Sequence, residues 1–521
     1  MHMDPSAPVI TRRQALQLPL AASVLTAVPK GFAQATRAPL QIVGLWEISG
    51  LSPAASGFVF TRLQITETLT DARDDGTPLP GLAASWTTSS NGLVWRFALR
   101  PTARFHDGTT VTAAAVVRCL NAARVAPALL SAAPIQQIDT DGSGTVVIQL
   151  SAAFHGLPAL LSHSSTMIVA PSSFAANGSL QSVVGSGPYR VTTLTPPQLV
   201  ETAVFDGYDG PKPAIERVRY LAAGRAETRA LMAESGQADL AYSLDPASLQ
   251  RLLKRPQVRI ESVLLPRTAI LKLNAAHPNL QDVRVRRALS LAMDRAGMAK
   301  ALLRDPALAA SQLFPPGLSG WHNPDLPALT YNPAEAGRLL AQAGWQLAAD
   351  GLRNANGQAS TLTLRTFPDR PELPVIASAL QAQWRQAGIA VQVSVGNSGD
   401  IPLGHRDGSL QLALAARNYA TLPDPTTTLL QDFGPDGGDW GAMGWKNDTM
   451  QAALGELTRS TPTAERRAVL RAQLTRTLQT ELPVIPVAWY RQQVAVSQRL
   501  QGVSLDPLER SYRLSAMRWR T

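Results

Sequence analysis

The chain lacks the common motifs in which side chains make or break bonds. It has no Gly-x-Ser-x-Gly nucleophile elbow, no His-Glu-x-x-His metal motif, no phosphate-binding Gly-Lys-Ser/Thr loop and no Gly-x-Gly-x-x-Gly loop. Each of these patterns places a nucleophile, a metal ligand or a backbone amide where a reaction needs it. Their absence favours binding over catalysis. A secreted hydrolase with an unfamiliar site stays open as an alternative.

Histidine and cysteine offer little for metal or redox chemistry. The seven histidines are scattered, at positions 2, 106, 155, 163, 277, 322 and 405. His155 and His163 are separated by Pro158, which is a poor arrangement for two metal ligands on one helix. Cys119 is the only cysteine, so we expect it to be a small buried hydrophobic residue. We predict no metal site made by the protein alone and no cofactor.

The loop at residues 417–425 is the richest candidate for binding a ligand. Its polar side chains with that capacity are Arg417, Asn418, Tyr419 and Asp424. Arg417 could hold a carboxylate through two parallel hydrogen bonds, or it could be a solvated surface charge. Trp440 and Trp445 flank a glycine-rich segment that follows. Aromatic side chains at a cleft hold varied ligands with few polar demands, although core packing is the alternative for each.

A hairpin followed by a helix is predicted for residues 79–120. Trp95, Phe97 and Leu99 alternate with other residues, as in a half-buried strand. Asn91-Gly92 is a turn signal because both residues accept positive φ. Thr112 is a suitable N-cap for the apolar run at residues 113–120.

The order of residues in this stretch resembles the signature of the family 5 extracellular solute-binding proteins. These are peptide-, dipeptide- and nickel-binding receptors of ABC importers. The matching segments are Leu82-Ala83-Ala84-Ser85-Trp86, Trp95-Arg96-Phe97-Ala98-Leu99-Arg100 and Phe105-His106-Asp107-Gly108. The chain departs from the signature at Ala115, where the family usually has aspartate.

Further segments extend the resemblance from about Leu40 to the end of the chain. Residues 184–190 resemble the family's GTGPY turn, and residues 235–240 resemble its sGeaDi segment. Residues 282–295 match its D.rvRqAl..AiDr helix and have the apolar spacing of an amphipathic helix. We expect the arginines of this helix to form a solvated or structural face.

The resemblance also suggests ligand contacts. In peptide-binding members an aspartate near an Asp-Pro pair holds the ligand's α-ammonium group, and Asp424 matches it best. A carboxylate in a closed cleft would gain a charge-assisted hydrogen bond there, whereas a simple Asp-Pro turn is the alternative. Trp46 is expected at the cleft edge of the first strand. The nickel-binding branch often has a histidine after the pair, but Thr426 follows here; a metal carried by a small chelator stays possible.

The N-terminal 35 residues are interpreted as a signal peptide that is removed on export. Thr11-Arg12-Arg13 resembles a twin-arginine motif, an apolar stretch follows, and Ala33-Gln34-Ala35 is a small-x-small cleavage site. An ordinary secretory signal is the alternative. The net charge of +10 is spread over scattered residues, so it does not predict nucleic-acid binding.

Together these features predict an α/β protein with the type II periplasmic-binding-protein fold, in which hinge strands join two lobes. Lobe I is expected at residues 36–78, 187–268 and 489–521, with an extra subdomain at 79–186, and lobe II at 269–488. The implied function is a periplasmic receptor that captures di- or oligopeptides and delivers them to an ABC permease and ATPase. A nickel or other metal chelate is the alternative ligand. We expect a monomer that contacts the membrane only through the permease.

Overall fold

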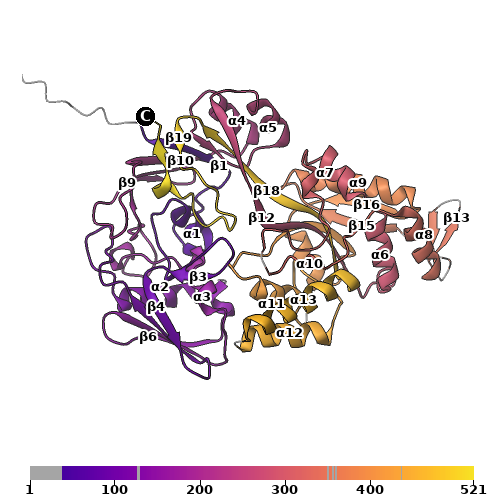
Figure 1. Cartoon of the computed structure of the whole chain (residues 1–521), viewed down its shortest axis with the longest axis horizontal. Helices are drawn as coiled ribbons and strands as arrows, with labels where there is room; N and C mark the ends of the chain where they lie inside the picture. Colours follow the sequence, from indigo (N-terminus) through magenta and orange to yellow (C-terminus); the bar gives the residue numbers. More distant parts are fainter. Residues whose placement is uncertain are drawn as a thin grey trace, which may run out of the picture. The chain divides into compact units, whose positions relative to one another are not determined.

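Two long antiparallel strands cross the middle of the structure, β12 (Val258–Leu273) and β18 (Val484–Ser497) (Figure 1). In this computed structural model the described residues are 38–125, 129–318, 320–348, 351–354, 357, 359, 361–435, 437–460 and 462–520. The predicted signal peptide lies outside them. Among the described residues, no helix has both the length and the apolar character needed to span a bilayer.

β12 and β18 belong to one mixed sheet that continues through both halves of the protein. The strand order is β16-β15-β17-β12-β18-β11-β1-β10-β9-β8. On one side of the long pair lie β11 (Leu240–Ala241), β1 (Leu40–Gly44), β10 (Arg217–Ala222), β9 (Leu199–Val204) and β8 (Tyr189–Thr195). On the other side lie β17 (Leu412–Asn418), β15 (Thr361–Thr366) and β16 (Ala390–Val395). We call the β1 side lobe I, the β17 side lobe II, and the long pair the hinge strands.

The register of the hinge strands is broken midway. Leu265 pairs with Tyr490 and the next pair is Thr268 with Trp489, so β12 carries two extra residues there. One of them is Pro266, which cannot donate a ladder hydrogen bond. The interruption lies where the sheet passes from one lobe to the other.

A second, four-stranded sheet lies within the residues predicted to form the extra subdomain of lobe I. Its strand order is β4 (Ala83–Thr88), β5 (Val94–Leu99), β7 (Thr145–Leu150), β6 (Ile135–Thr140), and α2 (Ala113–Ala123) packs near β6 and β7. Trp95, Phe97 and Leu99 are buried on β5, which confirms the predicted alternation. The Thr112 side chain accepts a hydrogen bond from the Ala115 amide, which confirms the predicted N-cap.

Lobe I also contains helices and short strands outside these two sheets. They are α1 (Pro53–Arg62), β2 (Thr70–Ala72), β3 (Pro78–Pro80), η1 (Leu129–Ala132), α3 (Leu157–Leu160), η2 (Ser164–Thr166), η3 (Pro171–Ser173), α4 (Ala226–Glu234), α5 (Pro246–Leu252), β19 (Leu500–Gln501), η5 (Leu514–Ala516) and β20 (Arg518–Trp519). The Ser52-Pro53 pair starts α1, since proline is well suited to the first helical position.

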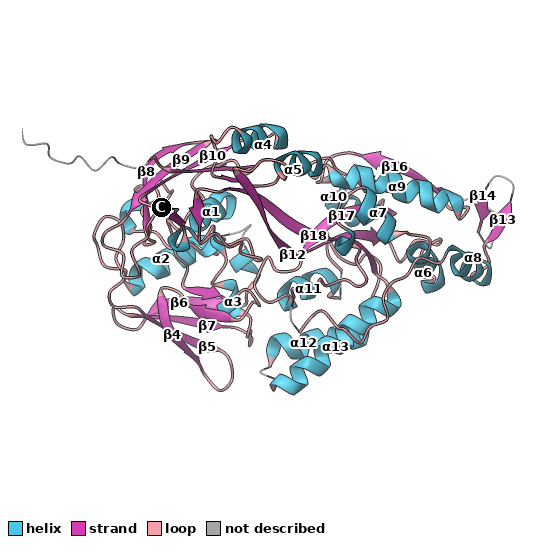
Figure 2. Cartoon of the chain, turned by 45° about the horizontal axis from the view of Figure 1, so that its top comes forward, coloured by secondary structure: helices cyan, strands magenta, loops and turns pink. Residues whose placement is uncertain are grey.

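Lobe II is an α/β unit. The helix α9 (Glu372–Gln386) connects β15 to the parallel strand β16. The other elements are α6 (Val283–Leu291), α7 (Arg295–Ala301), η4 (Pro306–Leu308), α8 (Pro333–Gln342), β13 (Gln346–Ala348), β14 (Gly351–Arg353), α10 (Asp400–Arg406), α11 (Thr426–Phe433), α12 (Asp448–Arg459) and α13 (Ala464–Glu481). Figure 2 shows α11, α12 and α13 as a group beside the hinge strands.

Candidate functional site

A cavity of about 940 Å³ lies between the two lobes. Lobe I supplies most of its wall, from α1, the β2–β3 hairpin, residues 162–164 and the tail at residues 506–516. Arg267 of β12 and residues 418–423 of lobe II complete the wall. The volume is in the range of small-molecule sites. The described residues lining it include five arginines and five carboxylates, so the wall carries both charges in balance.

An arginine held by two aromatic rings forms one side of the cavity. Trp46 and Phe58 meet edge to face, with ring centroids 5.8 Å apart. The guanidinium carbon of Arg62 lies 5.6 Å from the Trp46 ring and 5.3 Å from the Phe58 ring. Arg62 also donates from Nε to the Glu509 carbonyl at 2.6 Å. These contacts fix the guanidinium group at the last turn of α1.

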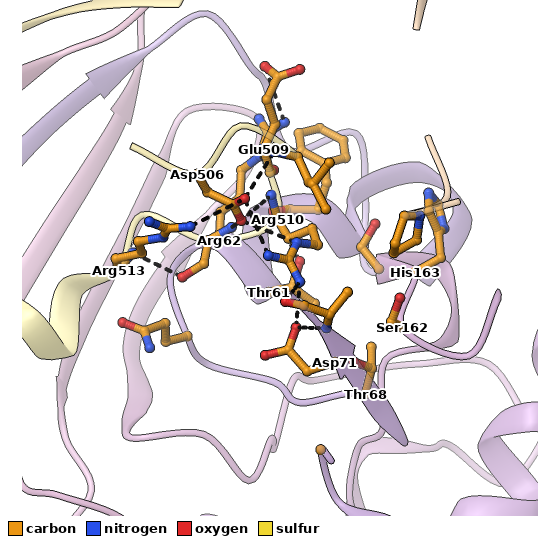
Figure 3. Close-up of a pocket in the computed structure, with 18 of the residues that line it drawn as sticks. Thr61, Arg62, Thr68, Asp71, Ser162, His163, Asp506, Glu509, Arg510 and Arg513 are labelled. Carbon is orange, nitrogen blue, oxygen red and sulfur yellow. Dashed lines mark hydrogen bonds and ion pairs between the residues drawn. The ribbon is translucent and has the colours of Figure 1, made fainter. Parts of the chain in front are cut away.

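The tail of lobe I contributes a network centred on Asp506 (Figure 3). The buried Asp506 carboxylate accepts hydrogen bonds from the backbone amides of Leu508, Arg510 and Ser511. It also pairs with the side chains of Arg510 and Arg513. The side chains of these two arginines are therefore held at defined positions beside the cavity.

Both arginines reach from the tail to the β2–β3 hairpin. Arg510 donates to the Asp71 carboxylate at 2.7 Å and to the Ala72 carbonyl. Arg513 binds the Asp74 carboxylate. Because the side chains of Asp71 and Asp74 are 61% and 54% exposed, they remain open to a ligand as well as to the arginines.

Glu509 connects the tail to the hinge. Its carboxylate accepts a hydrogen bond from Arg267 of β12 at 2.6 Å, and Arg62 lies 3.9 Å away. Burial alone would raise the pKa of Glu509, but Arg267, Arg62 and Arg370 outweigh it and hold that pKa below its usual range. Glu509 is therefore ionised at neutral pH.

His163 lies beside the cavity at the start of η2. Its Nδ1 accepts a hydrogen bond from the Ser165 amide at 3.1 Å, which places the proton of the neutral ring on Nε2. Burial lowers the pKa of His163 to about 4, so the ring is neutral at physiological pH. The side chain can thus offer an N–H donor to an anionic group.

Of the predicted ligand-binding residues, Trp46 and Asn418 line this cavity. Lobe II contributes Asn418, Ala420, Thr421 and Pro423 from the predicted loop, and none of the four is charged. Thr421 donates to the Asn418 carbonyl, and Asn418 accepts from the Ala420 amide. This part of the wall is therefore a neutral turn held by its own hydrogen bonds.

The other predicted residues lie outside the cavity lining. Arg417 forms a bidentate ion pair with the buried Asp432. Tyr419 is fully buried and packs against Phe314. Trp440 packs near Phe367 in the lobe II core, and the buried Trp445 donates to Glu481. Their contacts are structural, and their predicted role in ligand binding stays untested.

Asp424 lines a second cavity, of about 480 Å³. Its carboxylate pairs with Arg471 of α13 at 2.9 Å and accepts from the Thr426 amide at 2.7 Å. This is the turn arrangement that the sequence offered as the alternative. Its predicted role toward an α-ammonium group stays a prediction.

The sequence reasoning missed the tail network altogether. The available signal was the density of charge in residues 506–513, where two acidic and two basic side chains lie within eight positions. Nothing in that pattern shows which charges pair or that they meet the β2–β3 hairpin. Among the described residues, no three histidine, cysteine, aspartate or glutamate side chains are grouped so that they could hold a metal ion.

Comparison with known proteins identifies the family. The model of the bacterial extracellular solute-binding proteins, family 5, matches residues 77–440. The nickel-binding periplasmic protein of Escherichia coli K12 is 27% identical over 494 residues, which are 90% of this chain and 93% of that protein. A probable di/tripeptide-binding protein of Pseudomonas aeruginosa is 26% identical over 358 residues, 63% of this chain and 65% of that protein.

A solved structure shares the fold. NikA from Brucella suis, in complex with Fe(III)-EDTA, superposes with a TM-score of 0.83 at 23% identity, covering 92% of this chain and all of that one. The predicted type II periplasmic-binding-protein fold is thereby confirmed. The chain belongs to the bacterial extracellular solute-binding proteins of family 5, which are receptors of ABC importers and not enzymes.

Proposed function

We propose that this receptor captures a compact, carboxylate-bearing metal chelate between its lobes and delivers it to an ABC permease and ATPase. The proposal rests chiefly on the environment of Asp424. The side chain expected to hold a peptide's α-ammonium group lies outside the 940 Å³ cavity and is paired with Arg471. The lobe II residues that do line the cavity are uncharged.

The cavity wall suits the carboxylates of a chelate. The guanidinium group of Arg62 and the Nε2–H of His163 can both donate to anionic oxygens. Trp46 and Phe58 offer apolar surface beside them. Related proteins support the same choice. A relative that matches 90% of this chain is named for nickel, and NikA from Brucella suis was solved in complex with Fe(III)-EDTA. The chelator would supply the ligands of the metal cargo.

A di- or tripeptide is the second candidate, favoured by one observation. Asp71 and Asp74 border the cavity with more than half of each side chain exposed, and either could take an α-ammonium group. The P. aeruginosa relative is named for such ligands. We further propose that the protein is exported by the twin-arginine route and that it acts as a monomer.

A thermal-shift and calorimetry panel on the full chain, stripped of bound ligand, tests the function. The probes are nickel with L-histidine, Fe(III)-EDTA, nickel alone, L-histidine alone, and di- to pentapeptide mixtures. A probe at ~100-fold its dissociation constant should stabilise the folded state by about 2.7 kcal/mol. We expect this stabilisation with the chelates and not with the separate metal or chelator.

Two variants distinguish the candidates. His163→Phe should weaken chelate binding about tenfold by removing a donor, whereas Asp424→Ala should leave it within about twofold. Stabilisation by peptides alone that disappears in Asp424→Ala would reject the chelate proposal and establish the α-ammonium role predicted from the sequence.

A further inference from the structure

The β2–β3 hairpin ends in a tight turn built around Gly76. The Arg73 amide donates to the Thr77 carbonyl at 2.8 Å, and the Gly76 amide donates to the Arg73 carbonyl at 3.0 Å. The Asp75 carboxylate accepts from the Thr77 amide at 2.9 Å. Gly76 has φ +87°, in the region that glycine adopts without strain.

The tip of this hairpin touches lobe II. A Cβ atom placed on Gly76 would overlap the carbonyl oxygen of Pro423 and lie 2.8 Å from its carbonyl carbon. Real side-chain atoms do not approach a backbone carbonyl that closely. The contact therefore exists only because residue 76 has no side chain.

The hairpin is fixed on lobe I along β2 and at the start of its turn. Arg510 holds it through Asp71 and Ala72, and Arg513 holds it through Asp74. The hairpin is thus carried by lobe I, and its tip meets lobe II at Pro423. A second contact between the lobes lies close by in the structure, where the His155 amide donates to the Thr458 carbonyl at 3.1 Å.

The hairpin tip also separates the two cavities. Asp71, Ala72, Arg73 and Asp74 line the 940 Å³ cavity, whereas Asp75, Gly76, Thr77 and Pro78 line the 480 Å³ cavity. On lobe II the division falls at the same place, since Pro423 lines the first cavity and Asp424 the second. The Gly76–Pro423 contact is therefore a wall between the two spaces.

We propose that Gly76 is a positioning residue for ligand capture, whose missing side chain lets the hairpin tip seat against Pro423 and seal the ligand cavity when the lobes close. The proposal rests on capture of a solute between the lobes, whichever solute it is. A side chain at residue 76 would hold the lobes apart at this point, so the closed form would lose its advantage in ligand affinity.

The chain provides a closely matched control. Asp107-Gly108-Thr109 repeats the sequence of Asp75-Gly76-Thr77, and its aspartate accepts from the threonine amide at 3.0 Å in the same way. Gly108 has φ +84°, but a Cβ atom placed on it would meet nothing within 4 Å. Gly76→Ala and Gly108→Ala therefore both place a side chain at positive φ. Only Gly76→Ala also disturbs a contact, the one with Pro423.

Hydrogen exchange of the His155 amide tests the contact without requiring a known ligand. That amide is protected by a bond between the lobes, so it reports closure at this point. In the full chain, Gly76→Ala should speed its exchange several-fold relative to Gly108→Ala, while the two variants keep melting temperatures within about 2 °C of each other. Equal exchange in the two variants, with and without the probes below, would overturn the proposal.

Binding supplies the second readout. The probes are nickel–L-histidine, Fe(III)-EDTA and short peptides. For whichever probe the wild type binds, Gly76→Ala should lower the affinity about ten- to hundredfold, mainly through faster dissociation. Equal affinity in both variants would reject the role of Gly76 while leaving the proposed function intact. Absence of binding in the wild type, together with faster exchange in Gly76→Ala, would reject the proposed ligands and support the hairpin contact.

Discussion

Lys272 is a fully buried cation in the core of lobe II. Its ammonium group donates to the carbonyls of Gly438 and Gly441 at 2.7 and 2.6 Å, and it lies 2.8 Å from Nδ1 of His405. Burial lowers the pKa of Lys272 to about 7, with Asp432 and Asp439 opposing the shift and Arg417 adding to it. The side chain fixes the glycine-rich segment that carries Trp440.

This environment predicts a stability that depends on pH. Between pH 7 and 10.5 the unfolded chain keeps the Lys272 proton and the folded chain releases it, so unfolding becomes less favourable as pH rises. Lys272→Met removes this effect. Between pH 6 and pH 9, the free energy of unfolding of the wild type should rise by about 1 to 3 kcal/mol more than that of the variant, as measured by urea unfolding.

Lys300 is exposed, so Lys300→Met is the control. Its free energy of unfolding should differ from that of the wild type by the same amount over this pH range. Burial, together with the charge of Lys272, lowers the pKa of His405 below its ordinary value. If the difference in free energy of unfolding between wild type and Lys272→Met stayed constant from pH 6 to pH 9, Lys272 would keep its proton when buried.

Single residues also show the limits of the sequence argument. Thr112 as an N-cap follows from local chemistry, since its hydroxyl serves an amide three positions away. Arg417 and Asp432 are fifteen positions apart, and their pairing depends on how β17 and α11 are arranged. Charge type alone could not distinguish that structural pair from a ligand contact.

At the scale of elements, the arginines of the segment at residues 282–295 include both exposed and buried ones, which matches the solvated or structural face expected from the sequence. Arg286 donates to the carbonyls of Glu481, Leu280 and Gln281. Arg295 donates to the carbonyl of Pro486 on β18 and to the carbonyl and hydroxyl of Ser290. Arg284 and Arg287 are exposed. Arg295 thus attaches α7 to the hinge strand β18, and Arg286 attaches α6 to the end of α13, in agreement with the structural role offered by the sequence.

Removing one of these groups should therefore destabilise lobe II. Arg295→Met leaves three buried acceptors without their donor, and we expect a loss of about 3 kcal/mol or more in the free energy of unfolding. Arg295→Lys should recover only part of it, because an ammonium group cannot reproduce the planar fork. Urea unfolding gives the values, with the exposed Arg287→Met expected within about 1 kcal/mol of wild type. A loss no larger than that of the control would contradict the attachment.

The elements were largely predictable from sequence, whereas the site was not. Alternation in β5, the turn at Gly92 and the N-cap at Thr112 are local signals, and the structure confirms them. The pairing of the hinge strands joins residues more than 200 positions apart, such as Val258 with Ser497. The meeting of the tail with the β2–β3 hairpin depends on contacts more than 400 positions apart, such as Arg510 with Asp71. Only the family resemblance supplied the fold.

For the whole molecule, the hinge combines interrupted strand pairing with a buried charge. The register shift at Pro266 weakens the ladder where the two lobes join. Beside it, Glu509 of the lobe I tail receives Arg267 from the hinge strand and is stabilised in its ionised form by Arg370 of lobe II. The relative position of the lobes should therefore depend on this carboxylate.

Glu509→Gln tests that dependence while preserving side-chain shape. The variant leaves Arg62, Arg267 and Arg370 without their shared counter-charge, so we expect a loss of about 3 kcal/mol in stability. We also expect a larger radius of gyration for the unliganded protein in small-angle X-ray scattering, because the repelling guanidinium groups belong to both lobes and the hinge. Glu456→Gln, which removes an exposed pair with Arg466, is the control and should change neither the stability appreciably nor the radius. If both variants scattered alike and lost equal stability, Glu509 would be an ordinary ion pair, and the interrupted strands alone would set the position of the lobes.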